Sequence, residues 1–330
     1  MKKLLMIMFV VLLLTGCGKN DEKNVTNSIV KKFNNSTGYK LDGELEITNN
    51  DDVYNYNVNV NYDKKNNYYK VVFVNQSNDF KQIILKNKSG VYLYTPSLNK
   101  SFKFSNNWPY KNSQIYLYDT IINDIKTDEK KTFSFRDNKY IFMTKVNYSN
   151  NSKLTKQKIV FDNNYKIKMI VIYNNKGETV MKLMIDKIKM SPKFKKNSFE
   201  LDYSLKDDNK NVDKQTMSID DVIYPLVIPS GTKLVDEKKV KKDNGQRVIM
   251  TYEGEKNFLL VEETIDVFND YTTISTGGVP YQLLDTIGVM TNNSLSWTSG
   301  NLQYYLISDM MNQEELVEVA QSMVRVESFK

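Results

Sequence analysis

The chain contains a single cysteine, Cys17, whose position gives its thiol a possible chemical role. Lys2 and Lys3 provide a positive start, and Leu4 to Leu14 form an uninterrupted apolar run of 11 residues. A helix needs about 20 apolar residues to cross a bilayer, so this run is too short to span one. Its length and charge are typical of a secretory signal peptide. Cys17 stands directly after the small residues that end the signal.

The segment Leu14-Thr15-Gly16-Cys17 resembles the lipobox of bacterial lipoproteins. The resemblance implies cleavage before Cys17, a diacylglycerol on its thiol, and a location on the extracytoplasmic face of the cell membrane. Two acyl chains give a lasting anchor, because each buried CH₂ contributes about 0.8 kcal/mol. We therefore expect a signal peptide over residues 1–16 and a polar tether over residues 17–23. The alternative is an ordinary signal peptide with a chance cysteine.

Other residue patterns that could support catalysis or metal binding are incomplete. The chain has no histidine, which excludes Ser-His-Asp triads, Cys-His pairs and His-ligated zinc. Ser97 and Lys100 match S-x-x-K, but the S-D-N and K-T-G elements that accompany it do not occur. The acidic stretch from Asp207 has Val212 and Ser218 where a calcium loop needs Gly and Glu. We expect no catalytic residues, no metal, and no cofactor beyond the lipid on Cys17.

The charge distribution argues against nucleic acid as a partner. The formal net charge is +7, or +5 once Lys2 and Lys3 leave with the signal, and only three basic residues are Arg. A nucleic-acid-binding protein concentrates positive charge on one patch, whereas these lysines are scattered among 39 acidic residues. The expected partners are the membrane, through the lipid, and either an apolar ligand or a protein of the cell envelope.

Apolar periodicity predicts the elements of the first part of the chain. Val25, Ile29 and Phe33 recur at helical spacing, which predicts a helix over residues 24–35. Residues 53–62 alternate apolar and Asn, the pattern of a strand with one buried face. We expect a second helix over 113–126, and further strands over 39–47, 68–75, 80–86, 90–96, 101–105, 132–136, 139–146, 156–162, 165–173 and 179–190. Short turns between them predict an antiparallel meander of about 11 strands.

A polar stretch after residue 190 separates this meander from a second, smaller α+β part. We expect domains over residues 24–205 and 217–330, joined by a linker over 206–216. Strands are predicted at 224–235, 246–254, 257–265, 281–290, 294–300 and 302–308, with a helix over 313–324. Asn312 and Glu315 have the spacing of a capping box at the start of this helix. The fold class is mainly β (α+β).

The alternating aromatic residues are candidates for an apolar binding cavity. These are Tyr54, Tyr56, Val58, Val60 and Tyr62 in one strand, with Phe73, Tyr92 and Tyr94 in later strands. A half-barrel too wide to fill itself would leave an apolar pocket between them. Alternatively, the same side chains fill the core of the sheet.

The order of elements resembles the LolA/LolB and MucB/RseB superfamily of unclosed barrels plugged by helices. The matching segments are Gly90 to Pro96 and Gly38 to Gly43. The second part resembles the small C-terminal domain of Firmicute sporulation and germination lipoproteins, at Ile228 to Thr232, Val248 to Glu253 and Asn257 to Leu260. The resemblance implies a concave apolar face that binds acyl chains.

These features predict a membrane-anchored, non-enzymatic binding module for an apolar ligand, either a lipid or a lipoprotein acyl chain. The alternative is a scaffold or regulator that docks an envelope or cell-wall partner in sporulation or germination. An empty, narrow core would favour docking, and a bound lipid would favour carriage.

Overall fold

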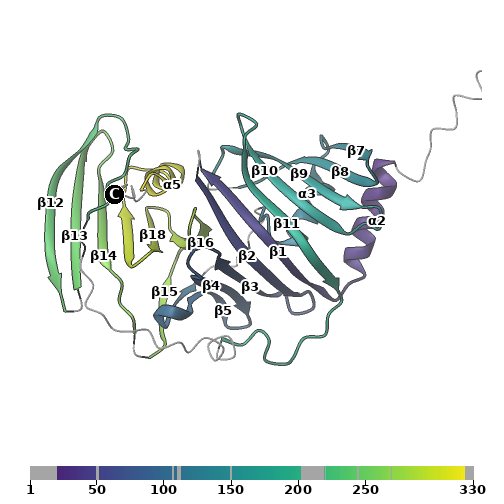
Figure 1. Cartoon of the computed structure of the whole chain (residues 1–330), viewed down its shortest axis with the longest axis horizontal. Coiled ribbons are helices and arrows are strands. Elements are labelled where there is room, and N and C mark those ends of the chain that lie inside the picture. The colour runs from purple at the N-terminus through teal and green to yellow at the C-terminus, as the bar shows by residue number, and fades with distance from the viewer. Residues whose placement is uncertain are drawn as a thin grey trace, which may run out of the picture.

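The computed structural model describes residues 21–49, 52–105, 108–109, 113–148, 151–201, 219, 221–243, 245–268 and 270–323. Within these residues the chain forms 19 strands and three α-helices, arranged as a 12-stranded sheet and a 7-stranded sheet (Figure 1). The large sheet is unclosed, since β15 (Thr272–Thr276) and β7 (Thr132–Arg136) form its two ends. The prediction of a mainly β chain with an unclosed meander and a smaller second part is therefore confirmed.

The first eleven strands form an antiparallel meander in two halves. They are β1 (Gly38–Asn49), β2 (Asp52–Asp63), β3 (Tyr68–Asn75), β4 (Lys81–Asn87), β5 (Gly90–Thr95), β6 (Lys100–Phe104), β7 (Thr132–Arg136), β8 (Lys139–Lys145), β9 (Leu154–Asp162), β10 (Ile167–Asn174) and β11 (Thr179–Met190). The first six run outward from β1, and the next five return so that β11 pairs with β1. The chain must therefore cross the sheet between β6 and β7.

The crossing segment contains α3 (Tyr118–Thr127) and packs on what we call the inner face of the large sheet. A helix over 113–126 was predicted, but residues 113–117 are not helical. Ile115 and Leu117 are nevertheless buried, at 2% and 0% exposure. Residues 115 and 116 form a turn, closed by a hydrogen bond from Leu117 N–H to Gln114 O at 3.0 Å, and their side chains belong to the core of the large sheet.

The first helix, α2 (Glu22–Asn34), packs against α3 and buries Val25, Ile29 and Phe33, as the periodicity predicts. Asp21 caps its start by accepting a hydrogen bond from the backbone N–H of Asn24 at 2.7 Å. The helix begins at Glu22 and so includes the end of the expected tether.

The second sheet has its own core. Its strands are β12 (Thr232–Lys242), β13 (Gly245–Gly254), β14 (Phe258–Thr264), β16 (Val279–Gln282), β17 (Ile287–Met290), β18 (Ser294–Ser299) and β19 (Leu302–Ile307). Helix α5 (Gln313–Gln321) buries Leu316, Val317, Val319 and Ala320 against this sheet, and Asn312 and Glu315 form the predicted capping box. The strand expected over 281–290 is instead the hairpin of β16 and β17, with residues 283–286 as its turn.

Two further features of the second part differ from prediction. The expected strand over 224–235 begins only at Thr232, and it continues through the charged residues to Lys242. The short strand β15 (Thr272–Thr276) was not predicted, and it pairs in parallel with β6 as the twelfth strand of the large sheet. The two parts of the chain thus share a sheet.

Candidate functional site

The inner face brings together most of the candidate cavity residues. Tyr56, Val58, Val60, Tyr62 and Phe73 are between 0% and 7% exposed and belong to one apolar cluster. The rings of Tyr56 and Phe73 meet edge to face with centroids 6.4 Å apart. Tyr54 is half-buried beside the same cluster.

Tyr92 and Tyr94 do not share this surface. Val91 and Leu93 of β5 point into the inner-face cluster, so the alternating Tyr92 and Tyr94 point to the outer face of the sheet. Tyr92 packs with Leu85 and Phe199, and Tyr94 meets the ring of Tyr271 at 5.6 Å. Every residue from Val91 to Thr95 is buried, so period-two patterning could not assign these side chains to a face.

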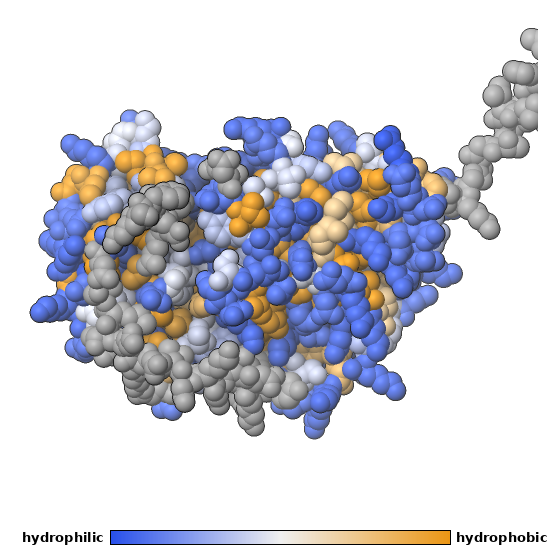
Figure 2. All heavy atoms as spheres, viewed as in Figure 1, coloured by the Kyte–Doolittle hydropathy of each residue, from blue (hydrophilic) through white to orange (hydrophobic). Residues whose placement is uncertain are grey.

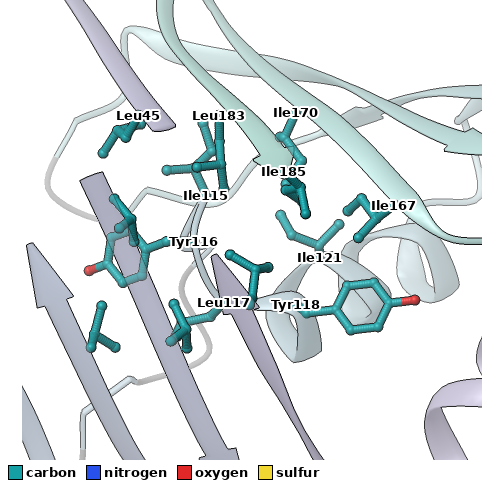
Figure 3. Packing of buried hydrophobic residues seen from close by; sticks show 14 of the residues in the cluster. Leu45, Ile115, Tyr116, Leu117, Tyr118, Ile121, Ile167, Ile170, Leu183 and Ile185 are labelled. Carbon is teal, nitrogen blue, oxygen red and sulfur yellow. The ribbon is translucent and has the colours of Figure 1, made fainter. Parts of the chain in front are cut away.

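The chain's own side chains cover the inner face. The covering residues of the crossing segment are all at most 4% exposed. They are Ile115, Tyr116 and Leu117, followed in α3 by Tyr118, Ile121, Ile122 and Ile125. Figure 3 shows Ile115 and Ile121 lying among Leu183, Ile185 and Ile170 of the overlying strands. The ring of Tyr116 packs edge to face on Phe73 with centroids 4.9 Å apart. The crossing segment and the large sheet therefore form one packed core.

A buried carboxylate ties α3 to this core. Asp119 accepts hydrogen bonds from the hydroxyls of Tyr39 at 2.9 Å and Tyr69 at 2.8 Å. Tyr39 Oη in turn accepts from the backbone N–H of Tyr118 at 3.0 Å. Burial raises the pKa of Asp119, and the two tyrosine hydrogen bonds and the charge of Lys86 oppose that rise in part. The network fixes the start of α3 against β1 and β3.

A second carboxylate, Asp124, lies one turn further along α3. Its Oδ2 accepts from Ser113 Oγ at 2.8 Å and from Gln157 Nε2 at 2.7 Å. Burial raises the pKa of Asp124 to about 6, although both hydrogen bonds lower it. These contacts join the end of α3 to β9 and to the start of the crossing segment.

The turn between β16 and β17 inserts into the open end of the large sheet. Leu284, Ile287 and Val289 belong to the core of the large sheet. Gln82, buried on β4, donates to Ile287 O at 2.9 Å and accepts from Ile287 N–H at 2.6 Å and Thr286 Oγ1 at 3.1 Å. This one side chain satisfies both backbone groups of Ile287.

Neighbouring side chains complete the junction. Tyr56 donates its hydroxyl to Leu284 O at 2.8 Å, and Asn75 Nδ2 donates to Asp285 O at 3.4 Å. Asp285 accepts a hydrogen bond from Ser299 Oγ, and its burial raises its pKa. Tyr56, a candidate for binding a ligand, thus binds the second part of the same chain.

Of the two S-x-x-K residues, Lys100 contacts the second part of the chain, whereas Ser97 is exposed. Ser97 lies in a short 3₁₀ turn, η1 (Pro96–Leu98), and Lys100 begins β6. Lys100 Nζ donates to Gln303 Oε1 at 3.3 Å, and burial lowers the pKa of Lys100. Asn99 Nδ2, between them, donates to Phe268 O at 2.9 Å.

The sequence did not predict the polar residues that join the large sheet to the β16–β17 turn. Gln82 stands in the run Phe80 to Leu85, where strand alternation places it on the same face as Ile84. A polar side chain at an apolar position is the available signal, but it does not name the partner, which lies more than 200 residues later.

The lipobox residues Leu14, Thr15, Gly16 and Cys17 lie outside the described residues, as does the linker over 206–216. None of the helices that the structure describes is long and apolar enough to span a bilayer. Among the described side chains, no three acidic residues converge in the manner of a metal site.

Comparison with known proteins assigns the family. The chain is 33% identical over 323 residues to "Sporulation protein YdcC" of Bacillus subtilis (strain 168), covering 95% of this chain and 93% of that protein. The chain therefore belongs to the family of that sporulation protein. Residues 222–323 match the family model described as a domain of unknown function, DUF4367.

Solved structures with a similar arrangement include two from the families named above. One is the Pseudomonas aeruginosa MucA/MucB complex, with a TM-score of 0.33, 8% identity, and coverage of 91% of this chain and 97% of that chain. Another is a LolA superfamily protein from Nitrosomonas europaea, with a TM-score of 0.29, 14% identity, and coverage of 54% and 98%.

Proposed function

We propose that this chain is a lipid-anchored, extracytoplasmic protein of sporulation that docks a protein partner and performs no catalysis. The name of its Bacillus relative supports the sporulation role. The charged start, the apolar run of 11 residues and Cys17 support export and lipidation at the membrane.

The main support for docking is that the inner face of the large sheet is already packed. Tyr56, Val58 and Phe73 are at most 3% exposed and lie under the chain's own crossing segment. An acyl chain needs a concave apolar surface of its own size, so it would have to displace α3 or the β16–β17 turn. A partner protein needs only an outer surface, which is present without rearrangement.

Carriage of an apolar ligand is the second candidate. The aromatic content of the inner face favours it, because Tyr56, Tyr62 and Phe73 would line the space left by a displaced α3. Reaching that state means breaking the Asp119 network and exposing three buried isoleucines of α3 to water.

Native mass spectrometry of the protein from sporulating cells, extracted in mild detergent, separates the two candidates. Docking predicts a protein complex whose only lipid is the covalent one. A stoichiometric, noncovalent lipid that an added fatty acid displaces would contradict docking and support carriage. Cys17→Ala is the matched control, because it removes the covalent lipid and leaves the inner face unchanged.

The same variant tests the anchor. Labelled palmitate should enter the unaltered chain, which should sediment with membranes after cell lysis. Cys17→Ala should lose the label and appear in the wash. Label retained in Cys17→Ala would refute the anchor.

A further inference from the structure

The outermost strand of the second sheet is long and exposed. β12 pairs with β13 through ten residue pairs, and in the strand order it has no neighbour on its other side among the described residues. Nine of its 11 residues are exposed, including Leu234, Val235 and Val240. The unpaired backbone groups of such an edge can receive another strand.

An exposed apolar segment lies alongside this edge. Tyr224 donates its hydroxyl to Glu237 at 2.6 Å, which brings the segment 224–228 next to β12. Leu226 is 71% exposed, the largest fraction among the large apolar side chains of the described residues, and Val227 is 50% exposed. We call β12 together with residues 224–228 the edge surface.

The charge of the edge surface selects among possible occupants. β12 carries five lysines against one Asp and one Glu. Lys242 forms ion pairs with Glu263 and Asp266, whereas Lys233, Lys239 and Lys241 are exposed. Like charges on facing strands are destabilising, so a second copy of β12 is a poor match. Opposite charges each contribute about 0.2–1 kcal/mol, which favours an acidic strand.

The place of β12 in the molecule argues against a lipid surface as the occupant. Glu22 follows Cys17 by five residues, which span at most about 18 Å when extended. The helix α2 that it begins lies at one end of the long axis, and β12 lies at the other (Figure 1). If Cys17 anchors the chain, as proposed above, the edge surface lies at the end of the molecule opposite to the anchored end.

We propose that the edge surface binds an extended, acidic segment of a partner protein, which adds as a strand beside β12. Backbone hydrogen bonds supply the pairing, and side chains at alternate positions supply the selectivity. Acidic residues of the partner face Lys239 and Lys241, on the face of β12 that Glu237 and the segment 224–228 share. Its alternate, apolar residues meet Val240 on the opposite face. This deepens the proposed docking function by naming the surface and the chemistry of the partner.

The test uses the chain from residue 17 onward, carrying Cys17→Ala so that no lipid is present. The probe is a labelled eight-residue peptide of alternating Glu and Val, followed by fluorescence anisotropy. The edge variant is Lys239→Glu with Lys241→Glu. The matched control is Lys88→Glu with Lys176→Glu, which makes the same charge change at exposed turns of the first part.

We expect the peptide to bind, with a Kd at least tenfold higher for the edge variant and within twofold for the control. The edge variant should instead bind a peptide of alternating Lys and Val, which shows that it is folded and that its selectivity has reversed. Salt should weaken both interactions, because exposed charges are screened.

Four results would overturn the proposal. The first is that the unaltered chain does not bind the Glu/Val peptide, and the second is that the edge variant and the control variant lose affinity for it equally. The third is that the chain self-associates and only the edge variant abolishes this self-association. The fourth is that truncation of the chain after Met323 raises its affinity for the peptide tenfold. The third would assign the edge to a second copy, and the fourth to the chain's own C-terminus. A failure here together with a protein complex in cells would mean that the partner docks elsewhere.

Discussion

Gln82 shows how a single side chain joins the two parts of the molecule. It sits at an inner-face position otherwise given to apolar residues, and its amide group meets both backbone groups of Ile287. A buried backbone group left without a partner costs about 1–3 kcal/mol, so a glutamine is favourable here despite its polarity.

Gln82→Ala is expected to destabilise the chain by about 2–5 kcal/mol, because it leaves Ile287 N–H and Ile287 O without their hydrogen-bond partner and creates a cavity. Urea unfolding followed by circular dichroism measures the change. Gln76→Ala, at an exposed position, is the control and should lie within about 0.5 kcal/mol of the unaltered chain. Equal stabilities of the two variants would contradict the role given to Gln82.

Asp124 gives the protein a specific dependence on pH. Its folded pKa of about 6 lies above the ordinary value of 3.8, chiefly because of burial. Folding therefore favours the protonated carboxyl. The stabilisation is present in full below pH 3.8 and is lost as pH rises through 6.

Asp124→Asn is expected to stabilise the chain at pH 7, by at most about 3 kcal/mol, because the amide oxygen keeps the hydrogen bonds without the buried charge. The gain should shrink towards pH 4. Urea unfolding at pH 4, 5, 6 and 7 measures the slope, with the exposed Asp137→Asn as control. A gain that does not vary with pH would refute this account.

At the scale of single elements, β1 owes its close pairing to a glycine. The register between β1 and β11 shifts at Gly43, where an added Cβ would lie 2.3 Å from Met184 O. No side chain can occupy that space unless the two strands separate, which would break the join between the two halves of the meander.

Gly43→Ala is therefore expected to destabilise the chain by about 1–3 kcal/mol through strain in the core strands. Thermal unfolding measures it. The control is Gly177→Ala in the β10–β11 turn, where nothing lies within 4 Å of an added Cβ and only the backbone conformation, with φ of 83°, resists. A smaller loss at Gly43 than at Gly177 would disagree with the packing argument.

At the scale of the whole molecule, the two parts of the chain share one sheet and one apolar core. β15 belongs to the large sheet, the β16–β17 turn lies in its core, and Lys153 pairs with Glu318 of α5. The surface along which they meet includes buried apolar and polar groups. Separation of the two parts would expose both to water.

We expect a single cooperative unfolding transition in scanning calorimetry, with the calorimetric enthalpy equal to the van't Hoff enthalpy. Gln82→Ala together with Tyr56→Phe should divide it into two, because these changes remove the hydrogen bonds of Ile287 and Leu284. Two transitions in the unaltered chain would show that the parts fold independently.

Local patterns in the sequence specify the individual elements. The alternation of residues 53–62, the helical spacing of Val25, Ile29 and Phe33, and the Asn312 and Glu315 cap all appear as expected. β3, β7 and β11 have the predicted bounds. These signals depend on neighbours within a few residues, which is why a single sequence carries them.

The tertiary structure determines what those elements meet. The pairing of β1 with β11, the parallel addition of β15, and the burial of Leu284, Ile287 and Val289 in the first core join positions far apart in the chain. Each depends on which distant segment comes to lie beside which, and β15 joins through backbone pairing although none of its residues is buried. Local periodicity does not indicate which distant segments meet. The sequence therefore places the candidate cavity residues on strands, but it does not predict the segments that cover them.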